Sequence, residues 1–312
     1  MIFTASFIIF ILCFSFCLIY VIQKIFISKN ITDEIISRSS HSSLASRSGG
    51  LSIFLTVFII SCYSYLQGYE IYDFSIIVPI SMLTIVGLYD DLYNVDFKLK
   101  FIFQIIFAKI IIDNGFIIDN LHGVFGLFEI GRLLAQVLTI LIIVAIINAI
   151  NFIDGIDGLA ISITLLFIIS FEFFASSNTG FYNLSILILS TLMPLYYFNF
   201  KKNSKVFLGD SGSLLLGGIV SVFVINILSN SYLIKPQFDL HKILFVISIL
   251  FYPIIDIIRI FFLRLIKGKS PFQPDNNHIH HLLLKRTNNH IYTTLIITGI
   301  SIFFIILIQI LF

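Results

Sequence analysis

Charged side chains are scarce in this chain. They make up 12% of its 312 residues, against about 25% in a typical soluble domain. Hydrophobic residues make up 58%, and the mean hydropathy is +1.03. The formal net charge of +2 provides no basic excess of the kind that favours nucleic acid. The long apolar runs instead predict an integral membrane protein, with a soluble protein of very apolar core as a remote alternative.

Tryptophan is absent and cysteine is rare. Without tryptophan, an aromatic belt at the membrane interface must come from the 13 tyrosines. Cys13, Cys17 and Cys62 all lie in apolar segments, so neither a disulfide framework nor a cysteine metal cluster is indicated. The first apolar run, near residues 3–22, has no basic segment before it and no small-residue cleavage site after it. We therefore expect an uncleaved first helix rather than a signal peptide.

The apolar runs predict an all-α, polytopic membrane protein with about ten transmembrane helices. The expected spans are 3–23, 49–67, 74–90, 97–113, 132–151, 157–175, 181–199, 212–229, 241–264 and 291–311. The span at 97–113 is the weakest, because three lysines interrupt it. No repeat, low-complexity segment or domain linker interrupts the sequence, which predicts a single transmembrane domain over residues 1–312.

An N-terminus outside the cell would place nearly all basic residues on the cytoplasmic side. Of the 19 Lys and Arg residues, all but Lys109, Arg132, Lys235 and Lys242 then lie in or beside the inner loops. The positive-inside rule supports this orientation. On the other side, glycines punctuate residues 114–131 between the fourth and fifth spans. This pattern predicts a hairpin on the outer surface.

The same alternation of spans places every cluster rich in Asp, His or Gly on the cytoplasmic side. The clusters occupy residues 46–50, 90–100, 148–159, 199–213 and 267–281. The sides were assigned by counting the apolar runs, without regard to where the polar clusters lie. Because all five clusters nevertheless fall on one side, we predict one composite site at the cytoplasmic membrane surface.

Two pairs of acids are candidates for chemistry. Asp90 and Asp91 end the third span, where adjacent negative charges oppose the helix dipole and are costly near hydrocarbon. A Mg²⁺ ion or a cationic partner would relieve that cost. Lys98 and Lys100 lie close enough in the sequence to be such partners or to hold a phosphate, and a solvated helix end is the alternative. Asp154 and Asp157 face the same way if a helix begins there. Helix capping explains one of these two acids but not both.

Residues 209–213 read Gly-Asp-Ser-Gly-Ser and again precede an apolar run. Glycines let backbone N–H groups approach a phosphate, and a helix N-terminus favours anions. Asp210 is suited to Mg²⁺, which bridges phosphate oxygens. An ordinary helix N-cap with flexible glycines is the alternative interpretation.

Three of the seven histidines, His278, His280 and His281, lie within four positions. Histidines near a hard-metal site more often bind phosphate or transfer protons than bind Mg²⁺. A zinc site is the alternative, but no cysteine accompanies them. Asp256 and Arg259, three residues apart in the ninth span, predict a mainly structural ion pair.

Taken together, these motifs resemble the polyprenyl-phosphate N-acetylhexosamine-1-phosphate transferases of glycosyltransferase family 4. The matching segments, in the same order along residues 45–285, are 47–50, 87–91, 148–159, 206–212, and 270–272 with 278–281. The His-Ile-His-His form resembles the branch that starts O-antigen, common antigen or teichoic acid linkage units. The muramoyl-pentapeptide branch is the alternative, but it typically has three consecutive histidines, and Ile279 interrupts them here.

The resemblance implies that the phosphate of undecaprenyl phosphate attacks the β-phosphate of a UDP-sugar, giving undecaprenyl-diphospho-sugar and UMP. UDP-GlcNAc is the default donor, and Mg²⁺ is the implied cofactor, with Mn²⁺ as the alternative ion. The enzyme would act on the cytoplasmic face of the cell inner membrane, in the first membrane step of cell-surface polysaccharide synthesis. Direct attack is the preferred mechanism, and a covalent aspartyl intermediate is the alternative. A homodimer is also expected, and no nucleic-acid partner.

The resemblance also implies roles for individual residues. Asp210 would bind the metal, with Asp154 beside it. The catalytic acids would be the pair Asp90 and Asp91, which position or deprotonate the lipid phosphate, and Asp154 with Asp157 on the nucleotide side. The residues expected to contact the nucleotide, diphosphate or sugar are Asn151, Asn199, Phe207, Arg47, Lys100, His278, His280 and His281.

An ion-coupled transporter is the alternative from a different class of protein. Acids within membrane segments would suit it, but coupling residues are expected near the bilayer midplane, in broken helices. Here the acids gather towards one face, and the half-buried candidate Asp256 has Arg259 close by. The sequence therefore favours the enzyme.

Overall fold

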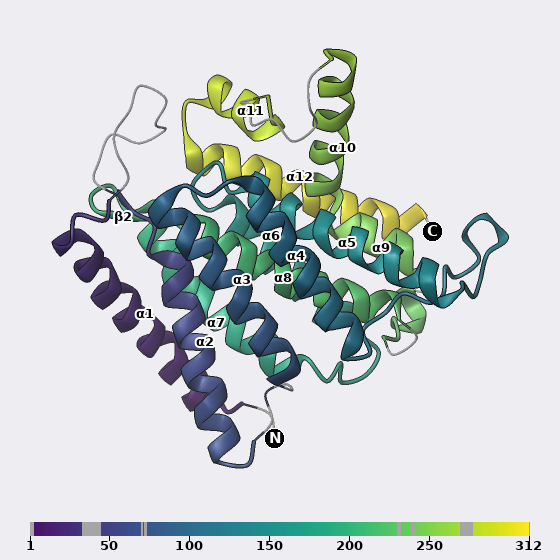
Figure 1. The fold of residues 1–312 in the computed structure, drawn as a ribbon, viewed down its shortest axis with the longest axis horizontal. Coiled ribbons are helices and arrows are strands. Elements are labelled where there is room, and N and C mark those ends of the chain that lie inside the picture. The colour runs from purple at the N-terminus through teal and green to yellow at the C-terminus, as the bar shows by residue number, and fades with distance from the viewer. Residues whose placement is uncertain are drawn as a thin grey trace.

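A computed structural model of the protein describes residues 3–32, 45–69, 71, 74–229, 232–238, 241–268 and 277–311. The motif at residues 270–272 lies outside the described residues. Helices dominate the described chain (Figure 1). They are α1 (Ala5–Ser28), α2 (Gly49–Leu66), α3 (Phe74–Tyr93), α4 (Phe97–Asp113), α5 (Arg132–Ile153), α6 (Leu159–Phe174), α7 (Tyr182–Phe200), α8 (Gly209–Leu228), α9 (Lys242–Ile249), α10 (Phe251–Ile266), α11 (Ile279–Thr287) and α12 (His290–Leu311), with short 3-10 turns η1 (Val124–Gly126) and η2 (Pro236–Phe238).

The prediction of an all-α, polytopic membrane protein is confirmed. Among the described residues, seven helices are long and apolar enough to cross a membrane: α1, α2, α3, α5, α7, α8 and α12. The bent pair α9 and α10 makes an eighth span if it is taken as one. Helix α6 has 16 residues and α4 has 17. Every expected span therefore has a helical counterpart, while the number that crosses the membrane stays a prediction.

The ninth expected span, 241–264, is wrong as a single straight helix. The chain bends by 81° between α9 and α10. Pro253 explains the break, because it lacks the N–H that would otherwise bond to the carbonyl of Ile249 in a continuous helix. Figure 1 shows α10 standing away from the bundle with α11 beside it. Helix α11 is a second correction, since we expected residues 267–286 to form a loop.

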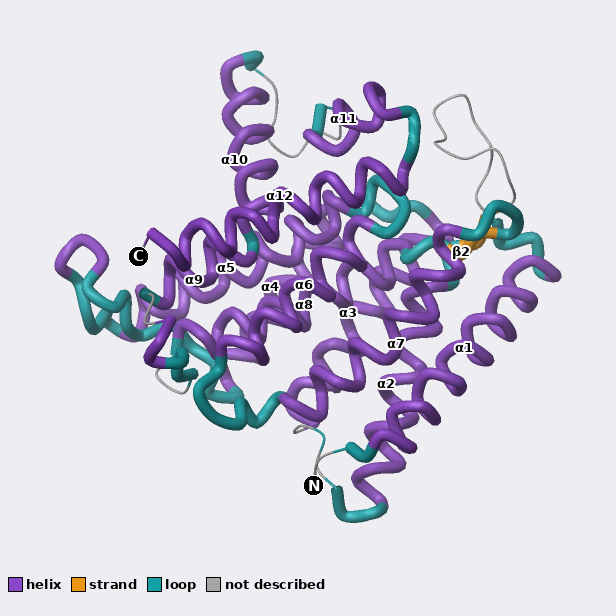
Figure 2. Tube along the Cα trace, turned by 180° about the vertical axis from the view of Figure 1, so that it is seen from behind, coloured by secondary structure: helices purple, strands orange, loops and turns teal. Residues whose placement is uncertain are grey.

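Helix α8 lies at the centre of the bundle. Its whole apolar stretch is buried inside the protein, and both views place it among the other helices (Figures 1 and 2). It packs chiefly against α3 and α5. Gly87 of α3 permits this approach, since a Cβ there would lie 2.5 Å from the carbonyl oxygen of Asp210. Small residues allow such close backbone contact between membrane helices, and here the contact brings the end of α3 to the first turn of α8.

The hairpin predicted at residues 114–131 is confirmed. The N–H of Leu121 donates to the carbonyl of Phe128 at 2.8 Å, and that of Ile130 donates to the carbonyl of Asp119 at 2.9 Å. The hairpin joins α4 to the start of α5, whereas the acidic turn at residues 154–158 follows the end of α5. The hairpin and the acidic turn are therefore separated by the length of α5, and the placement of the hairpin outside the cell stays a prediction.

Two short strands join loops that are far apart in the sequence. Strand β1 (Ala45–Ser46) pairs in parallel with β2 (Lys205–Val206), close to the left edge of the bundle in Figure 1. Just beyond them, the N–H of Gly49 donates to the carbonyl of Phe207 at 3.0 Å. This pairing holds the loop between α1 and α2, at the end that carries Arg47, against the chain that leads into α8.

Candidate active site

Asp91 caps the N-terminus of α8 from the neighbouring helix. Its side chain is 1% exposed, and its two carboxylate oxygens accept the backbone N–H groups of Asp210 at 2.9 Å and Ser211 at 3.0 Å. Arg47 Nη1 lies 4.0 Å from the same carboxylate. We expected these N–H groups to be available for phosphate, but a protein carboxylate already occupies that position. It satisfies two donors at the positive end of the helix.

Lys100 connects two acids from different helices. Its Nζ donates to Asp90 Oδ2 at 2.8 Å and to Asp210 Oδ2 at 3.2 Å. The other oxygen of Asp90 accepts the N–H of Val95 at 2.7 Å. Of the two lysines expected as partners of the acidic pair, Lys98 and Lys100, it is Lys100 that bonds to Asp90, and it joins α3, α4 and α8 at one point.

Asn151 holds the second oxygen of Asp210. Its Nδ2 donates to Asp210 Oδ1 at 2.6 Å and to Ser213 Oγ at 2.8 Å. The side chain of Asp210 remains 25% exposed, so its oxygens keep lone pairs that a ligand can reach. The last turn of α5 therefore orients Asp210, and Ser213, which the sequence argument did not select, takes part in this contact.

Asp154 follows the last residue of α5 and is half-buried. Burial raises the pKa of its carboxyl well above the usual range, and the negative charges of Asp210, Asp91 and Asp157 raise it further. Nearby cations offset only part of this charge. The surplus of carboxylate oxygens fits a hard divalent cation such as Mg²⁺, which prefers oxygen ligands. Asp210 and Asp154 are the residues that would hold it.

Asp157 contacts β2 and the start of α12. Its carboxylate pairs with Lys205 of β2, and its N–H donates to His290 Nδ1 at 3.1 Å. Its carbonyl accepts the hydroxyl of Thr294 at 2.8 Å. These contacts fasten the acidic turn to β2 and to the first turn of α12. No sequence motif marked these three partners, and the catalytic role expected for Asp157 stays a prediction.

Two of the residues expected to contact the nucleotide, diphosphate or sugar flank the connection between α7 and α8: Asn199 in the last turn of α7 and Phe207 just before α8. Asn199 Nδ2 donates to the carbonyl of Val206 at 2.9 Å. Its Oδ1 is buried and has no hydrogen-bond partner among the described residues. Phe207 is partly exposed and accepts the N–H of Gly49. Asn199 thus braces β2 with one end of its amide, and its contact with the nucleotide stays a prediction.

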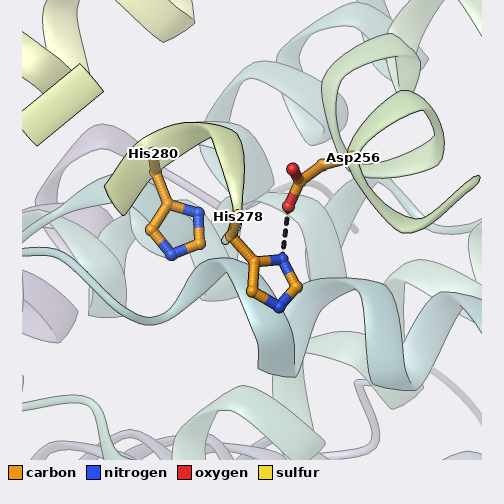
Figure 3. A group of neighbouring side chains, drawn as sticks. All are labelled: Asp256, His278 and His280. Carbon is orange, nitrogen blue, oxygen red and sulfur yellow. Dashed lines mark hydrogen bonds and ion pairs between the residues drawn. The ribbon is translucent and has the colours of Figure 1, made fainter. Parts of the chain in front are cut away.

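The histidine cluster packs against α10 (Figure 3). His278 Nδ1 lies 2.6 Å from Asp256 Oδ2, and the N–H of Ile279 donates to Asp256 Oδ1 at 2.8 Å. The predicted ion pair with Arg259 is confirmed at 3.5 Å. Sequence reasoning missed the contact with His278, because the two residues are 22 positions apart.

His280 reaches from α11 to the acidic turn. A Cβ placed on Gly155 would lie 2.6 Å from His280 Nε2 and 3.0 Å from His281 Cε1. The histidines of α11 and the turn after α5 are therefore in direct contact. Together with the contacts made by Asp91, Lys100 and Asn151, this brings described residues from each of the five polar clusters to one end of the bundle.

Comparison with known proteins gives consistent similarities. Residues 74–228 match the family described as glycosyl transferase family 4. The chain is 31% identical over 288 residues to the probable undecaprenyl-phosphate N-acetylglucosaminyl 1-phosphate transferase of Bacillus subtilis, covering 91% of this chain and 78% of that protein. It is 34% identical over 265 residues to the undecaprenyl-phosphate alpha-N-acetylglucosaminyl 1-phosphate transferase of Pasteurella multocida, covering 80% and 70%. With the decaprenyl-phosphate N-acetylglucosaminephosphotransferase of Mycobacterium leprae the identity is 29% over 285 residues, covering 83% and 71%.

Proposed function

This chain belongs to glycosyl transferase family 4, and from that membership we propose that it transfers N-acetylglucosamine 1-phosphate from UDP-GlcNAc to undecaprenyl phosphate, releasing UMP. One observation carries the proposal. The N-terminus of the buried helix α8 presents Asp210 within reach of Asp90, Lys100 and Asn151. A polar centre at the end of an apolar bundle is where a lipid phosphate and a soluble nucleotide can meet.

Phosphoryl transfer requires alignment and neutralisation of charge more than a strong protein nucleophile. A phosphate oxygen of the lipid forms a bond to the β-phosphorus of the donor, and the bond from that phosphorus to the oxygen of the departing UMP breaks. Mg²⁺ held by Asp210 and Asp154 would neutralise charge on the diphosphate. Lys100 supplies fixed positive charge beside Asp90, which orients the lipid phosphate or accepts its proton.

The setting of the reaction is also part of the proposal. The site faces the cytoplasm, the N-terminus lies outside, and the protein resides in the cell inner membrane as a homodimer. The positive-inside distribution of Lys and Arg supports the orientation, and the resemblance supports the dimer. A start of cell-surface polysaccharide synthesis is the pathway proposed for the product.

A donor panel tests this function. Purified protein is incubated with undecaprenyl phosphate, Mg²⁺, and UDP-GlcNAc, UDP-GalNAc or UDP-MurNAc-pentapeptide, and the lipid product is identified by mass. We expect undecaprenyl-diphospho-GlcNAc and an equal amount of UMP. Product from the pentapeptide donor alone would establish the muramoyl alternative, and no product from any donor would contradict the proposal.

A second assay separates direct attack from a covalent intermediate. The protein is incubated with UDP-GlcNAc and radiolabelled UMP in the absence of lipid. Direct attack predicts no label in UDP-GlcNAc, because no step can release UMP without the acceptor. Label that appears at a rate comparable to turnover would establish the aspartyl intermediate.

A further inference from the structure

One face of α10 carries two buried polar side chains, Tyr252 and Asp256, spaced four residues apart. Residues at this spacing lie on the same side of a helix. The hydroxyl of Tyr252 lies 2.9 Å from His280 Nδ1, and Asp256 Oδ2 lies 2.6 Å from His278 Nδ1. Each polar group of α10 therefore meets the Nδ1 atom of one histidine at the start of α11.

A metal site is one explanation of this cluster, since ligand atoms of Asp256, His278 and His280 all lie within 4.8 Å of one another. Geometry favours hydrogen bonds instead. Ligands of a tetrahedral zinc, each about 2.0–2.1 Å from the ion, lie roughly 3.3 Å apart. The separation of 2.6 Å between Asp256 and His278 is shorter and suits a charge-assisted hydrogen bond. The other oxygen of Asp256 already accepts the N–H of Ile279.

The hydrogen-bond chemistry differs for the two histidines. A carboxylate only accepts hydrogen bonds, so His278 carries a proton on Nδ1 and donates it to Asp256. In the pair Tyr252 and His280, the histidine Nδ1 is instead the acceptor. A buried tyrosine hydroxyl left without an acceptor is costly, and donation to His280 Nδ1 satisfies it. His280 then carries its proton on Nε2.

Burial keeps His280 neutral. Its side chain is fully buried, and burial lowers its pKa to about 3. A neutral ring with an acceptor at Nδ1 has one N–H, at Nε2. Figure 3 shows the Nε2 side of the His280 ring turned away from α11. The contact with Gly155 shows that it faces the acidic turn.

The Nε2 atom of His280 is buried and has no hydrogen-bond partner among the described residues. A buried donor without an acceptor costs free energy. The site that it faces also contains Asp154, which the proposed function places beside the sugar nucleotide. An acceptor oxygen from that ligand would satisfy the donor.

We propose that Tyr252 and Asp256 are positioning residues that hold His280 and His278 in opposite tautomers, so that His280 presents an N–H to a phosphoryl or carbonyl oxygen of the sugar nucleotide. This inference rests on the proposed function for the identity of the ligand. It gives a role in positioning the two histidines to α10, which stands away from the bundle (Figure 1). The bend between α9 and α10 sets the direction of α10, whose side chains contact His278 and His280.

The tautomers are measured directly, without substrate. Full-length protein labelled with ¹⁵N-histidine is examined by NMR, and the His280 signals are identified by their loss in His280→Gln. We expect His280 to be protonated on Nε2 and His278 on Nδ1. Tyr252→Phe should produce mixed tautomers at His280 and leave His278 unchanged. A His280 protonated on Nδ1 in the wild type would overturn the proposal, whether or not the protein turns over UDP-GlcNAc.

Kinetics test the consequence for the donor substrate. Tyr252→Phe should raise the KM for UDP-GlcNAc by about 3- to 10-fold with kcat within about twofold, since one neutral hydrogen bond contributes to ground state and transition state alike. Competitive inhibition by UDP distinguishes the acceptor. An equal rise in its inhibition constant places the oxygen on the UDP part of the donor, and no rise places it on the sugar. The matched control is Tyr292→Phe, at an exposed tyrosine of α12, which should change neither constant.

Asp256→Asn should lower kcat/KM by about 10- to 100-fold, because its amide can donate to His278 Nδ1 and reverse that tautomer. Asp256→Glu should recover part of the loss, and Asp113→Asn at an exposed acid of α4 should match the wild type. Retention of the wild-type melting temperature by Asp256→Asn excludes unfolding as the cause. Wild-type KM in Tyr252→Phe, or one zinc ion per chain by mass spectrometry, would overturn the proposal.

Discussion

The carboxylate of Asp91 accepts the backbone N–H of Asp210 at 2.9 Å, so an acid of α3 caps the helix that carries the proposed metal ligand. Its neighbour Asp90 does something different, because it faces Lys100 at 2.8 Å. The two adjacent acids therefore have different roles. Asp91 caps the backbone of α8, and Asp90 faces the site.

Asp91→Ala should therefore destabilise the protein. The substitution leaves two buried backbone N–H groups without an acceptor, at a cost of about 2–4 kcal/mol in the free energy of unfolding. Thermal unfolding in detergent measures the effect. Asp91→Asn, which keeps one acceptor oxygen, should lie between the wild type and Asp91→Ala.

Asp96→Ala is the matched control for this cap. Asp96 caps α4 through the N–H of Lys98 at 3.2 Å, but in an exposed position. Its loss should cost only about 1 kcal/mol. Equal melting temperatures for Asp91→Ala and Asp96→Ala would show that the buried cap has no special importance.

Asp210→Asn should abolish UMP release from UDP-GlcNAc while the protein stays in the membrane. The amide keeps the size of the side chain but removes the negative charge that would hold Mg²⁺ and that pairs with Lys100. Loss of one electrostatic contact at a reacting centre typically costs about 10²- to 10³-fold in rate. UMP release at saturating Mg²⁺ is the measurement, with Asp113→Asn as the control. Normal turnover would exclude Asp210 as the metal ligand.

The sequence predicted the helices well because apolar periodicity and length depend on local residues. It also predicted that the polar clusters share one side, because alternating spans determine sides. It did not predict the bend after α9. Pro253 was visible, but proline also occurs inside α3 and α7, so its effect depends on what the freed carbonyl and the neighbouring helices contact.

The partners within the site were harder to predict. The link between Lys100 and Asp90 is local, ten residues apart, and it was anticipated. The links from Asp91 to Ser211 and from Asp256 to His278 join distant segments. Nothing in the residue types distinguishes an acid that caps a helix from one that faces a ligand. That distinction depends on which backbone donors the packing of α3 on α8 brings within reach.

The orientation in the membrane can be tested with single cysteines in a background without Cys13, Cys17 and Cys62. Asn203 and Glu129 are exposed, in the loop before α8 and in the hairpin. Intact cells treated with a membrane-impermeant maleimide should label Glu129→Cys but not Asn203→Cys, which should react only after lysis. Labelling of Asn203→Cys in intact cells would reverse the orientation and remove the site from the cytoplasm.

The buried His280 should make stability depend on pH. Burial lowers its pKa to about 3 in the folded protein, against about 6.5 for an unperturbed histidine. Between these values the unfolded chain binds a proton that the folded chain does not, so the free energy of unfolding falls as the pH falls. From about pH 7.5 to about pH 5.5 the loss should be roughly 1.4 kcal/mol.

The change in melting temperature between these two pH values is the measurement. The groups acting on His280 are Asp256, Arg259, His278 and His281, and all of them remain in His280→Gln. That variant should therefore lose less stability on acidification than the wild type, whatever its stability at about pH 7.5. Asn203→Ala, at an exposed residue without a titratable side chain, should keep the wild-type slope. If His280→Gln loses as much stability on acidification as the wild type, the His280 ring takes up a proton in the folded protein as readily as in the unfolded chain. That result would contradict a neutral, buried imidazole.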